Sequence, residues 1–251
     1  MKEQERQRII RQKLVRLEAA PTLFSSALPT GFAALDEALA IGGLPRGRIV
    51  ELFGPSSSGK STLAMQTIAH LMRRGMTAAW NDVEHVFDPA QAAKLGIPVE
   101  QLPVAEPDSA EEALEIARQL AASGALDLLA IDSAAALVPR LELETAIGES
   151  GHGLHSRVLA SGLRRLASTA KQSNTVVLVL NQTRGRGDGG RGDEEISAGG
   201  PPLKLYAAVR IGLDAARGHH VRFRILKNKS GNAFQEGKLR WESGWRFSES
   251  L

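Results

Sequence analysis

The stretch Gly54-Pro55-Ser56-Ser57-Ser58-Gly59-Lys60-Ser61-Thr62 decides the fold, because it follows the pattern G-x-x-x-x-G-K-[ST] of a phosphate-binding loop. Its two glycines let the backbone turn tightly and bring its N–H groups close to a polyphosphate. Lys60 can reach the β- and γ-phosphates, and the Ser61 hydroxyl can bind Mg²⁺. We therefore predict that all nine residues bind a nucleoside triphosphate and that Ser61 is a metal ligand.

The residues on either side of this loop predict a strand before it and a helix after it. Residues 48–53 are mostly apolar, and apolar residues recur at helical spacing over residues 61–73. A strand, a glycine-rich loop and a helix N-terminus form the setting in which the pattern binds phosphate. The alternative is a Gly/Ser-rich surface loop that matches by chance, which this order of elements disfavours.

Length and composition indicate a single α/β domain in a chain of 251 residues. The sequence contains no cysteine, which excludes disulfides and thiolate metal sites. Residues 1–16 are strongly charged and lack the apolar core of a signal peptide, and no run of about 18 apolar residues exists. We therefore expect a cytoplasmic protein that has no contact with a membrane.

The chain is expected to have two parts. Residues 1–27 form a charged amphipathic helix, which ends before Pro21, and a linker. Residues 28–251 form the domain proper, with no C-terminal regulatory domain after it. The N-terminal helix can pack on its own domain or on a neighbouring subunit, and the sequence does not decide between the two.

Continuous apolar segments alternate with amphipathic ones along most of the chain. The expected buried strands are residues 48–53, 77–80, 102–105, 126–133 and 175–180. The expected helices are residues 32–39, 61–73, 88–95, 108–123 and 154–171. This alternation indicates an α/β fold, with a twisted and mostly parallel sheet covered by helices on both faces.

The last third of the chain has a different character. Residues 184–202 are rich in Gly, Arg and Asp, so we expect a mobile loop there. Residues 207–213, 220–226 and 239–246 read as strands of an antiparallel edge of the sheet.

Three polar side chains follow predicted strands and are candidates for the site. Asp132 ends an apolar strand, as expected of a Walker B carboxylate that holds Mg²⁺. Glu84 follows the strand after the phosphate-binding loop, where a carboxylate can polarise an attacking water. Gln182 follows another apolar strand, where an amide can sense a γ-phosphate. The alternatives are a surface or helix-capping role for Glu84 and a turn position for Gln182.

Basic residues are concentrated in the second half of the chain. Residues 157–191 contain seven Lys or Arg residues against one acidic residue, and residues 204–246 contain ten against three. Such asymmetry indicates a face that binds a polyanion, and two solvated surfaces are the alternative. Lys227 and Lys229 flank one residue and can point to the same side, where they can contact phosphates or form a solvated pair.

The order and spacing of these residues resemble those of RecA-type recombinases from about Leu28 to Phe247. Besides the phosphate-binding loop, the matching stretches include Leu35-Asp36, Gly42-Gly43-Leu44-Pro45, Glu84-His85, Asp88-Pro89, Ile131-Asp132-Ser133, Asn181-Gln182 and Lys227-Asn228-Lys229. The resemblance implies a RecA-like P-loop NTPase core. It also implies that ATP and Mg²⁺ are bound between adjacent subunits of a filament or ring on single-stranded DNA.

The resemblance assigns roles to the candidate residues. Glu84 would activate water, and Asp132 would hold Mg²⁺. Gln182 would couple the γ-phosphate to the DNA-binding loop that follows it. Lys227 and Lys229 would reach across to the ATP of the neighbouring subunit, like an arginine finger.

The resemblance also places the base of the nucleotide and the DNA. Asp88 and Gln91 would lie at the adenine, and Gln91 stands where the family usually has a stacking Tyr. Two segments, around residues 147–157 and 184–200, would correspond to the DNA-facing loops. Together with the helix between them, they give these predicted DNA-binding residues: Arg157, Arg164, Arg184, Arg186, Arg191, Gly199 and Gly200.

Two functions are compatible with the sequence. The first is a DNA-stimulated ATPase that assembles on single-stranded DNA for homologous recombination and DNA repair. The second is an accessory paralogue that binds other repair proteins or a translesion-synthesis complex, with ATP as a switch and little strand exchange. The second is motivated by the missing regulatory domain, by the lack of wedging apolar residues in 184–202, and by Leu205, where the family has a Phe.

Overall fold

The computed structural model describes residues 27–146, 153–184, 196–197, 200–214, 218–242 and 246–249. The predicted N-terminal helix lies outside the described residues, as do residues 147–152. The same holds for three of the predicted DNA-binding residues, Arg186, Arg191 and Gly199. The division of the chain between residues 27 and 28 stays a prediction.

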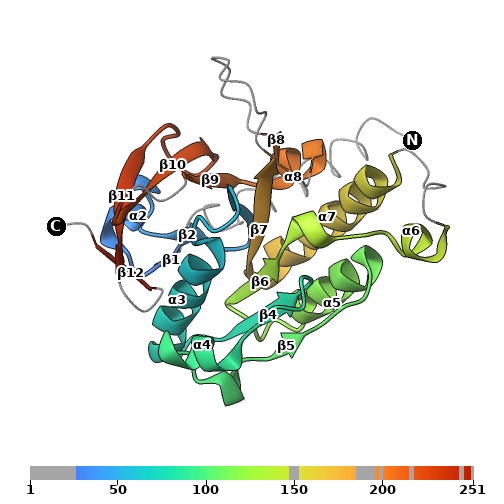
Figure 1. Cartoon of the computed structure of the whole chain (residues 1–251), viewed down its shortest axis with the longest axis horizontal. Helices are drawn as coiled ribbons and strands as arrows, with labels where there is room; N and C mark the ends of the chain where they lie inside the picture. The colour runs from blue at the N-terminus through green and yellow to red at the C-terminus, as the bar shows by residue number, and fades with distance from the viewer. Residues whose placement is uncertain are drawn as a thin grey trace, which may run out of the picture.

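One large sheet forms the middle layer of the molecule (Figure 1). Its strands are, in chain order, β3 (Ile49–Gly54), β4 (Ala78–Asp82), β5 (Val104–Ala105), β6 (Leu128–Asp132), β7 (Val176–Arg184), β8 (Ile196–Ser197), β9 (Val209–Leu213), β10 (His220–Asn228), β11 (Glu236–Glu242) and β12 (Arg246–Glu249). Two short strands, β1 (Ala27–Leu28) and β2 (Leu44–Pro45), pair with each other outside it.

The order across the sheet is β12-β11-β10-β9-β3-β7-β6-β4-β5, and β8 pairs with the end of β7. The pairs from β9 to β5 are parallel, whereas β10, β11 and β12 add an antiparallel edge. The predicted α/β class, with a mostly parallel sheet and an antiparallel edge, is therefore confirmed. Because β3, β7, β6 and β4 are neighbours and parallel, their carboxyl ends meet at one edge of the sheet.

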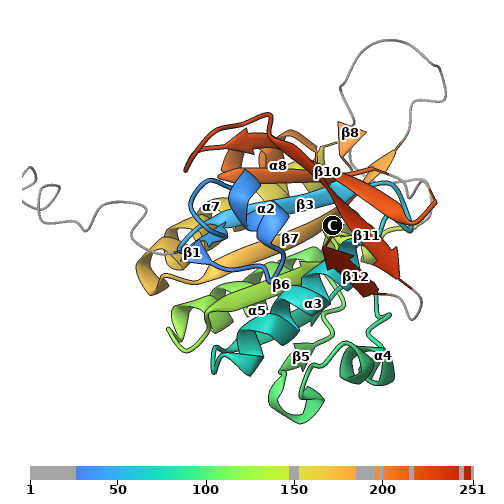
Figure 2. The same cartoon turned by 90° about the vertical axis from the view of Figure 1, so that its left-hand side faces the viewer.

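Helices cover both faces of this sheet. They are α2 (Ala33–Ala38), α3 (Lys60–Arg73), α4 (Pro89–Lys94), α5 (Ala110–Ala122), α6 (Arg140–Glu144), α7 (Leu154–Ser173) and α8 (Gly200–Tyr206), with 3₁₀ turns η1 (Val99–Gln101) and η2 (Ala134–Ala136). Figures 1 and 2 show α3 on one side of the sheet and α5 and α7 on the other. None of the described helices is long and apolar enough to cross a membrane.

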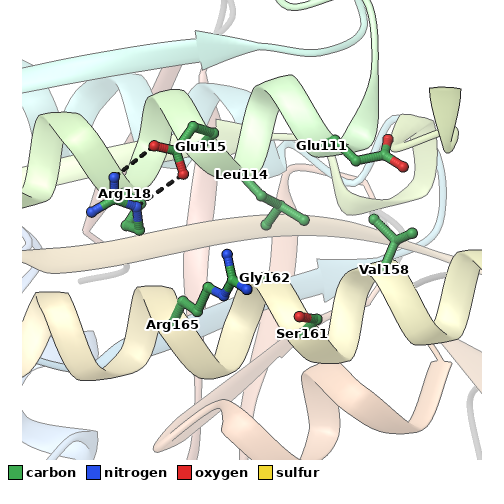
Figure 3. Close-up of a pocket in the computed structure, with 8 residues that line it drawn as sticks. All are labelled: Glu111, Leu114, Glu115, Arg118, Val158, Ser161, Gly162 and Arg165. Atoms are coloured by element: carbon green, nitrogen blue, oxygen red, sulfur yellow. Dashed lines mark hydrogen bonds and ion pairs between the residues drawn. The ribbon is translucent and has the colours of Figure 1, made fainter.

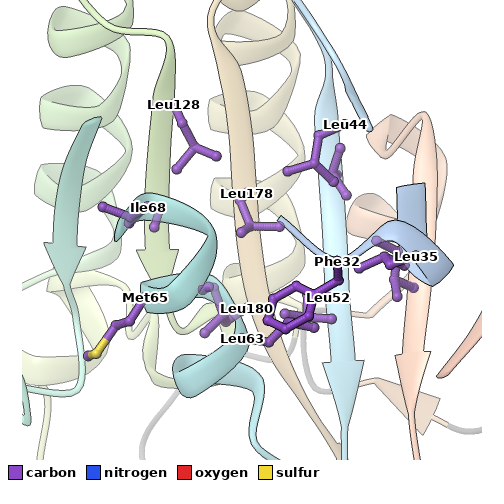
Figure 4. Close-up of a cluster of buried hydrophobic side chains, with 14 of the residues drawn as sticks. Phe32, Leu35, Leu44, Leu52, Leu63, Met65, Ile68, Leu128, Leu178 and Leu180 are labelled. Atoms are coloured by element: carbon purple, nitrogen blue, oxygen red, sulfur yellow. The ribbon is translucent and has the colours of Figure 1, made fainter. Parts of the chain in front are cut away.

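Side chains from alternate positions of each strand build two separate cores. Leu128, Leu178 and Leu180 face the cluster under α2 and α3 (Figure 4). Their neighbours Leu129 and Val179 face the cluster under α5, α7 and α8. A strand that is buried on both faces has no polar side to alternate with, which is why these segments read as continuous apolar runs.

Local capping explains where two of the helices begin. The Ser109 hydroxyl accepts a hydrogen bond from Glu112 N at 3.3 Å, and two glutamates occupy the first turn of α5. Asp88 Oδ1 accepts hydrogen bonds from Ala90 N at 2.8 Å and from Gln91 N at 3.3 Å at the start of α4. Both caps satisfy N–H groups that have no partner inside the helix.

The structure differs from the expectations at the carboxyl-terminal third. The strand expected over residues 239–246 is two antiparallel strands, β11 and β12, which pair through Trp241 and Phe247. The segment expected as a mobile loop, residues 184–202, is structured at both ends, because β7 continues to Arg184 and α8 begins at Gly200, and residues 185–195 and 198–199 lie outside the described residues. The buried Leu203 fixes α8 against the core beside α7, which compensates for its two prolines.

The central strand β7 gives a direct test of this core. Leu178 is 3% exposed, so Leu178→Ala should lower the free energy of unfolding by about 2–5 kcal/mol through lost burial and the cavity left behind. Urea unfolding measures the change. The matched control is Leu141→Ala on α6, where the side chain is 60% exposed and a change within about 0.5 kcal/mol is expected. Equal losses in both variants would contradict the assignment of the core.

Candidate functional site

The phosphate-binding loop joins β3 to α3 and requires glycine at two positions. Gly59 has a φ of +89°, and a Cβ atom there would overlap the ring of Phe247. A Cβ atom at Gly54 would overlap the carbonyl oxygen of Leu213. α3 then begins at Lys60 with no side chain capping its N-terminus. The first N–H groups of α3, at the positive end of the helix dipole, are therefore available to an anion.

The last described strand is packed against this loop. In α3, Gln66 donates from Nε2 to Phe247 O at 3.0 Å and accepts from Phe247 N at 2.6 Å. The Phe247 ring lies edge-on to Trp241, with 4.6 Å between the ring centroids. β12 is thus fixed to the helix that carries Lys60, and its aromatic side chain supports the loop at Gly59.

Lys60 is held by the loop itself. Its Nζ donates to Pro55 O at 2.7 Å and to Gly54 O at 3.1 Å, and the residue is only 8% exposed. Burial lowers the pKa of this ammonium, while the nearby carboxylates of Asp132 and Glu84 act in the opposite direction. Neutral carbonyls are weak partners for a buried ammonium, so a polyphosphate would be a better one.

Ser61 and Asp132 are in direct contact. Ser61 Oγ donates to Asp132 Oδ2 at 2.7 Å, although the residues are 71 positions apart in the chain. Burial, helped by the charges of Glu84 and Asp82, raises the pKa of Asp132 to about 6, although Ser61 and Lys60 act in the opposite direction. The site therefore holds more negative charge than its one lysine balances.

These residues fit Mg²⁺ and a triphosphate. A hydroxyl and a carboxylate oxygen are ligands that Mg²⁺ accepts, and this ion usually takes its other ligands from water and phosphates. No group of three His, Cys, Asp or Glu side chains is arranged around a common metal position in the described residues. The Ser58 hydroxyl is buried in the loop and has no hydrogen-bond partner within the described chain, as expected of a group that faces a ligand.

Glu84 and Gln182 also lie together. Gln182 Nε2 donates to Glu84 Oε1 at 3.1 Å, and Ser133 Oγ donates to the same oxygen. Glu84 and Ser133 follow β4 and β6, whereas Gln182 lies near the end of β7, opposite Gly54 in the register. We call Lys60, Ser61, Glu84, Asp132 and Gln182 the strand-end cluster, because the edge of the sheet brings them together.

Two residues of this site were not singled out from the sequence. Ser133 holds Glu84, as described above. Asp82 is buried opposite Asp132 in the register of β4 and β6, and its Oδ2 accepts from Phe87 N at 2.7 Å. That bond closes the turn on which Glu84 lies. The sequence carried one signal for them. Asp82 ends a buried strand and Ser133 directly follows one, at the edge of the sheet where the other site residues lie.

The predicted adenine residues have a structural role in the described chain. Asp88 caps α4 through Ala90 and Gln91, and Gln91 is half-buried in the first turn of that helix. α4 follows the turn of Glu84, so both residues are on the segment that leaves the strand-end cluster. Their contact with a base stays a prediction.

Lys227 and Lys229 are not brought to the phosphate-binding loop of their own chain. Lys227 lies opposite Arg210, which in turn lies opposite Glu51 in the first half of β3, whereas the loop follows the end of β3. Lys227 Nζ donates to Lys204 O at 2.6 Å and to Leu205 O at 3.3 Å. Lys229 lines a cavity at the beginning of β3.

The predicted DNA-binding residues are separated in the fold. Arg157 and Arg164 are exposed on α7, and Arg157 lies in its first turn. Arg184 ends β7 and Gly200 begins α8, so both border the segment that follows Gln182. Their contact with DNA stays a prediction.

A second cavity lies between α5 and α7, away from the strand-end cluster (Figure 3). Leu114 packs against Gly162, where a Cβ atom would be too close to the leucine side chain. Arg118 on its rim makes a bidentate pair with Glu115 at 2.6 and 2.9 Å, and these hydrogen bonds lower the pKa of Glu115 to about 2. An arginine engaged in this way has little left for an anionic ligand.

Comparisons with known proteins agree with this geometry. The model of the RecA N-terminal domain family matches residues 2–244. Protein RecA of Gluconacetobacter polyoxogenes is 44% identical over 232 residues, which cover 89% of this chain and 67% of that protein. Protein RecA of Thermus thermophilus is 44% identical over 236 residues, which cover 90% of this chain and 69% of that protein.

A solved structure shares the fold at lower sequence identity. The crystal structure of the RadB recombinase superposes with a TM-score of 0.69, covering 89% of this chain and 100% of that one, at 20% identity. The family match extends over nearly the whole chain. On this evidence the chain belongs to the RecA family of DNA-dependent ATPases.

Proposed function

We propose that this chain binds ATP and Mg²⁺ at the junction between two copies, assembles on single-stranded DNA and hydrolyses ATP during homologous recombination and DNA repair. The observation that carries the proposal is the strand-end cluster. It combines an uncapped helix N-terminus, a buried lysine, a Ser–Asp pair and a Glu–Gln pair at one edge of the sheet. Each of these groups has a defined task in phosphoryl transfer.

The loop and α3 bind the triphosphate. The N–H groups at the start of α3 face the phosphates, and the Lys60 ammonium exchanges the carbonyl oxygens of Gly54 and Pro55 for phosphate oxygens. Ser61 and Asp132 hold Mg²⁺, the aspartate directly or through water. When bound, the ion neutralises charge on the phosphates and holds them in a fixed orientation.

Glu84 is the catalytic base of the proposal. Ser133 and Gln182 both donate to Glu84 Oε1, which fixes the orientation of the carboxylate. Asp82 holds the turn that carries it. A carboxylate positioned in this way can take a proton from the water that attacks the γ-phosphate.

Gln182 connects hydrolysis to DNA. Its amide donates to Glu84, and two residues later β7 ends at Arg184, where the predicted DNA-binding segment begins. A contact of this amide with the γ-phosphate would compete with its contact to Glu84. Binding of DNA to the segment after Gln182 would therefore change how Glu84 is held, which gives a physical route for DNA stimulation.

The proposed partners and cellular location are inferred from the family. Single-stranded DNA and further copies of the chain are the proposed partners, and the cytoplasm is the proposed location. Other repair proteins are candidate partners of the second function, an accessory paralogue that uses ATP as a switch. Leu205 on α8, 66% exposed, is the observation that favours this alternative, because a smaller apolar group offers less contact to a neighbouring copy.

Electron microscopy with ATP and single-stranded DNA separates the two functions. Regular filaments support the recombinase. Particles that stay single while the chain still binds ATP and a repair protein support the accessory role.

Substitutions in the strand-end cluster test the catalytic assignment. Lys60→Ala should abolish ATP binding, whereas Glu84→Gln should keep binding and lower DNA-stimulated turnover by about a hundredfold or more, because the base is lost. Steady-state hydrolysis with and without single-stranded DNA measures turnover, and a fluorescent ATP analogue measures binding. The control is Glu115→Gln on α5, which makes the same change outside the site. Unchanged turnover in Glu84→Gln would refute the role of this residue.

The buried charge of Asp132 predicts a pH-dependent stability. Its pKa is raised from the ordinary 3.8 to about 6, so the folded protein keeps a proton that the unfolded chain loses, and stability falls as the pH rises through this window. Asp132→Asn cannot ionise and should be more stable than the wild type by about 1–3 kcal/mol at pH 8 without nucleotide. At pH 4 this gain should disappear.

Urea unfolding without nucleotide at the two pH values measures this effect. Asp88→Asn is the matched control, because it makes the same change at an exposed helix cap that asparagine can also fill. A gain for Asp132→Asn that is equal at pH 4 and pH 8 would argue against a costly buried carboxylate.

The salt dependence of DNA binding tests the arginines after β7. If Arg184, Arg186 and Arg191 contact phosphates, replacing all three by Gln should flatten the slope of log affinity against log salt by about two to three units. Fluorescence anisotropy with labelled single-stranded DNA measures the slope. Arg118→Gln, which removes an arginine already paired with Glu115, should leave it unchanged. A slope that the triple variant does not alter would place the DNA elsewhere.

A further inference from the structure

Three neighbouring strands carry polar side chains that meet inside the core. Glu51 in β3 is fully buried, and its Oε1 accepts a hydrogen bond from Asn181 Nδ2 in β7 at 2.9 Å. Its Oε2 pairs with Arg210 Nε in β9, directly opposite in the register. Val50 and Leu52 face the core under α2 and α3, so Glu51 between them points to the other face of the sheet. We call Glu51, Asn181 and Arg210 the buried network.

Arg210 balances the charge of Glu51. Its side chain is 12% exposed, and its guanidinium carbon lies 4.5 Å from the centroid of the Phe53 ring. Gly212, two residues further along β9, leaves room for this ring, because a Cβ atom there would lie 3.2 Å from Phe53 Cζ. A buried carboxylate is tolerated when it is both paired and hydrogen-bonded, and Glu51 meets both conditions.

The Asn181 side chain is held in one orientation. Its Nδ2 faces the Glu51 carboxylate, which can only accept, so its Oδ1 points the other way and accepts from Gln182 N at 2.9 Å. An acceptor on one side and an N–H group on the other call for a short side chain that both donates and accepts, as asparagine does. The backbone of Gln182 is therefore held by a side chain that is anchored in β3.

Gln182 connects the buried network to the strand-end cluster. Its side-chain amide donates to Glu84 Oε1 at 3.1 Å, and it extends from the backbone that Asn181 holds. Glu51 lies three residues before Gly54, where the phosphate-binding loop begins. Its bond to Asn181 therefore ties the strand that enters the loop to the strand that carries Gln182. This tie fixes Gln182, and through it Glu84, relative to the loop.

We propose that Glu51 and Asn181 are positioning residues for ATP hydrolysis, which act on Glu84 through Gln182 from the face of the sheet opposite α3. The inference rests on the proposed function, in which Glu84 takes the proton of the attacking water. A network that only fills the core would affect stability alone. A network that positions Glu84 also affects turnover, with little effect on nucleotide binding.

Asn181→Ala removes the bond to the Gln182 backbone. Turnover at saturating ATP and single-stranded DNA should fall about tenfold, while the affinity for a fluorescent ATP analogue should stay within about threefold of the wild type. The matched control is Asn81→Ala, because Asn81 in β4 is also fully buried and donates to Ala113 O at 2.9 Å. It should lose similar stability in urea but keep turnover within about twofold. Equal losses of turnover in the two variants would overturn the inference.

A double-mutant cycle shows whether the effect passes through Gln182. In Gln182→Ala the amide that holds Glu84 is already missing, so the further change Asn181→Ala should lower turnover by less than about twofold. A second, independent tenfold loss would show that Asn181 acts by another route, and the proposed role would then be wrong.

An exchange of donor and acceptor tests the role of Glu51. Asn181→Asp alone sets two carboxylates against each other and should lose both stability and turnover. Glu51→Gln with Asn181→Asp restores the chain of bonds, because the new glutamine accepts from Arg210 and donates to the new aspartate, which still accepts from Gln182 N. This pair should regain turnover to within about threefold of the wild type.

A folded pair that is no more active than Asn181→Asp would contradict the proposed order of bonds. If Asn181→Asp does not fold, Asn181→Ala is the reference that the pair has to exceed. Circular dichroism and urea unfolding establish that each variant is folded before its turnover is compared.

The outcomes separate this inference from the proposed function. A loss of turnover in Glu84→Gln together with normal turnover in Asn181→Ala overturns the role of the buried network and leaves the ATPase intact. Unchanged turnover in Glu84→Gln overturns both, because the network then has no base to position.

Discussion

The burial of both faces of the parallel sheet is the constraint on which the site depends. Side chains of β3, β6 and β7 alternate between the core under α3 and the core under α5 and α7, so each strand is fixed from two sides. With both faces packed, polar groups of the central strands either pair with one another in the core, as Glu51 does with Asn181 and Arg210, or lie near the carboxyl ends of the strands. Lys60, Asp132 and Gln182 lie there, beyond buried apolar segments that fix the backbone carrying them. The positions of the site residues therefore depend on the packing of the core.

The buried charges of the site lower the stability of the folded protein when no ligand is bound. Asp82 and Asp132 are buried next to Glu84, with Lys60 as the counter-charge, and the result is a raised pKa for Asp132. Such an arrangement destabilises the empty protein and favours the state with a bound cation and polyphosphate. A contrasting case lies on the other side of β3, where Glu51 is fully buried but is held by both Asn181 and Arg210. That group is satisfied and needs no ligand.

Sequence reasoning could predict the parts of this protein that depend on local pattern. The loop, its flanking elements and Asp132 follow from spacing, and the sheet class follows from continuous apolar runs. It could not predict contacts set by the sheet order, such as the bond of Ser133 to Glu84 or that of Lys227 to α8. It also joined β11 and β12 into one strand, because only three residues separate them in the sequence and short strands carry little periodic signal. α8 was missed because Gly200, Pro201 and Pro202 argue against a helix, which the packing of Leu203 overrides.

The packing of β12 against α3 has a consequence for the synthesis of the protein. Gln66 finds its partner in Phe247, 181 positions further along the chain, and the same phenylalanine closes over Gly59. A contact over such a sequence separation forms late, because a long loop of chain has to be ordered first. During synthesis, a nascent chain can build β3, α3 and β4 long before β12 has left the ribosome. The phosphate-binding loop is therefore complete only after β12 has been synthesised, and a truncated translation product that lacks β12 would be a poor competitor for nucleotide.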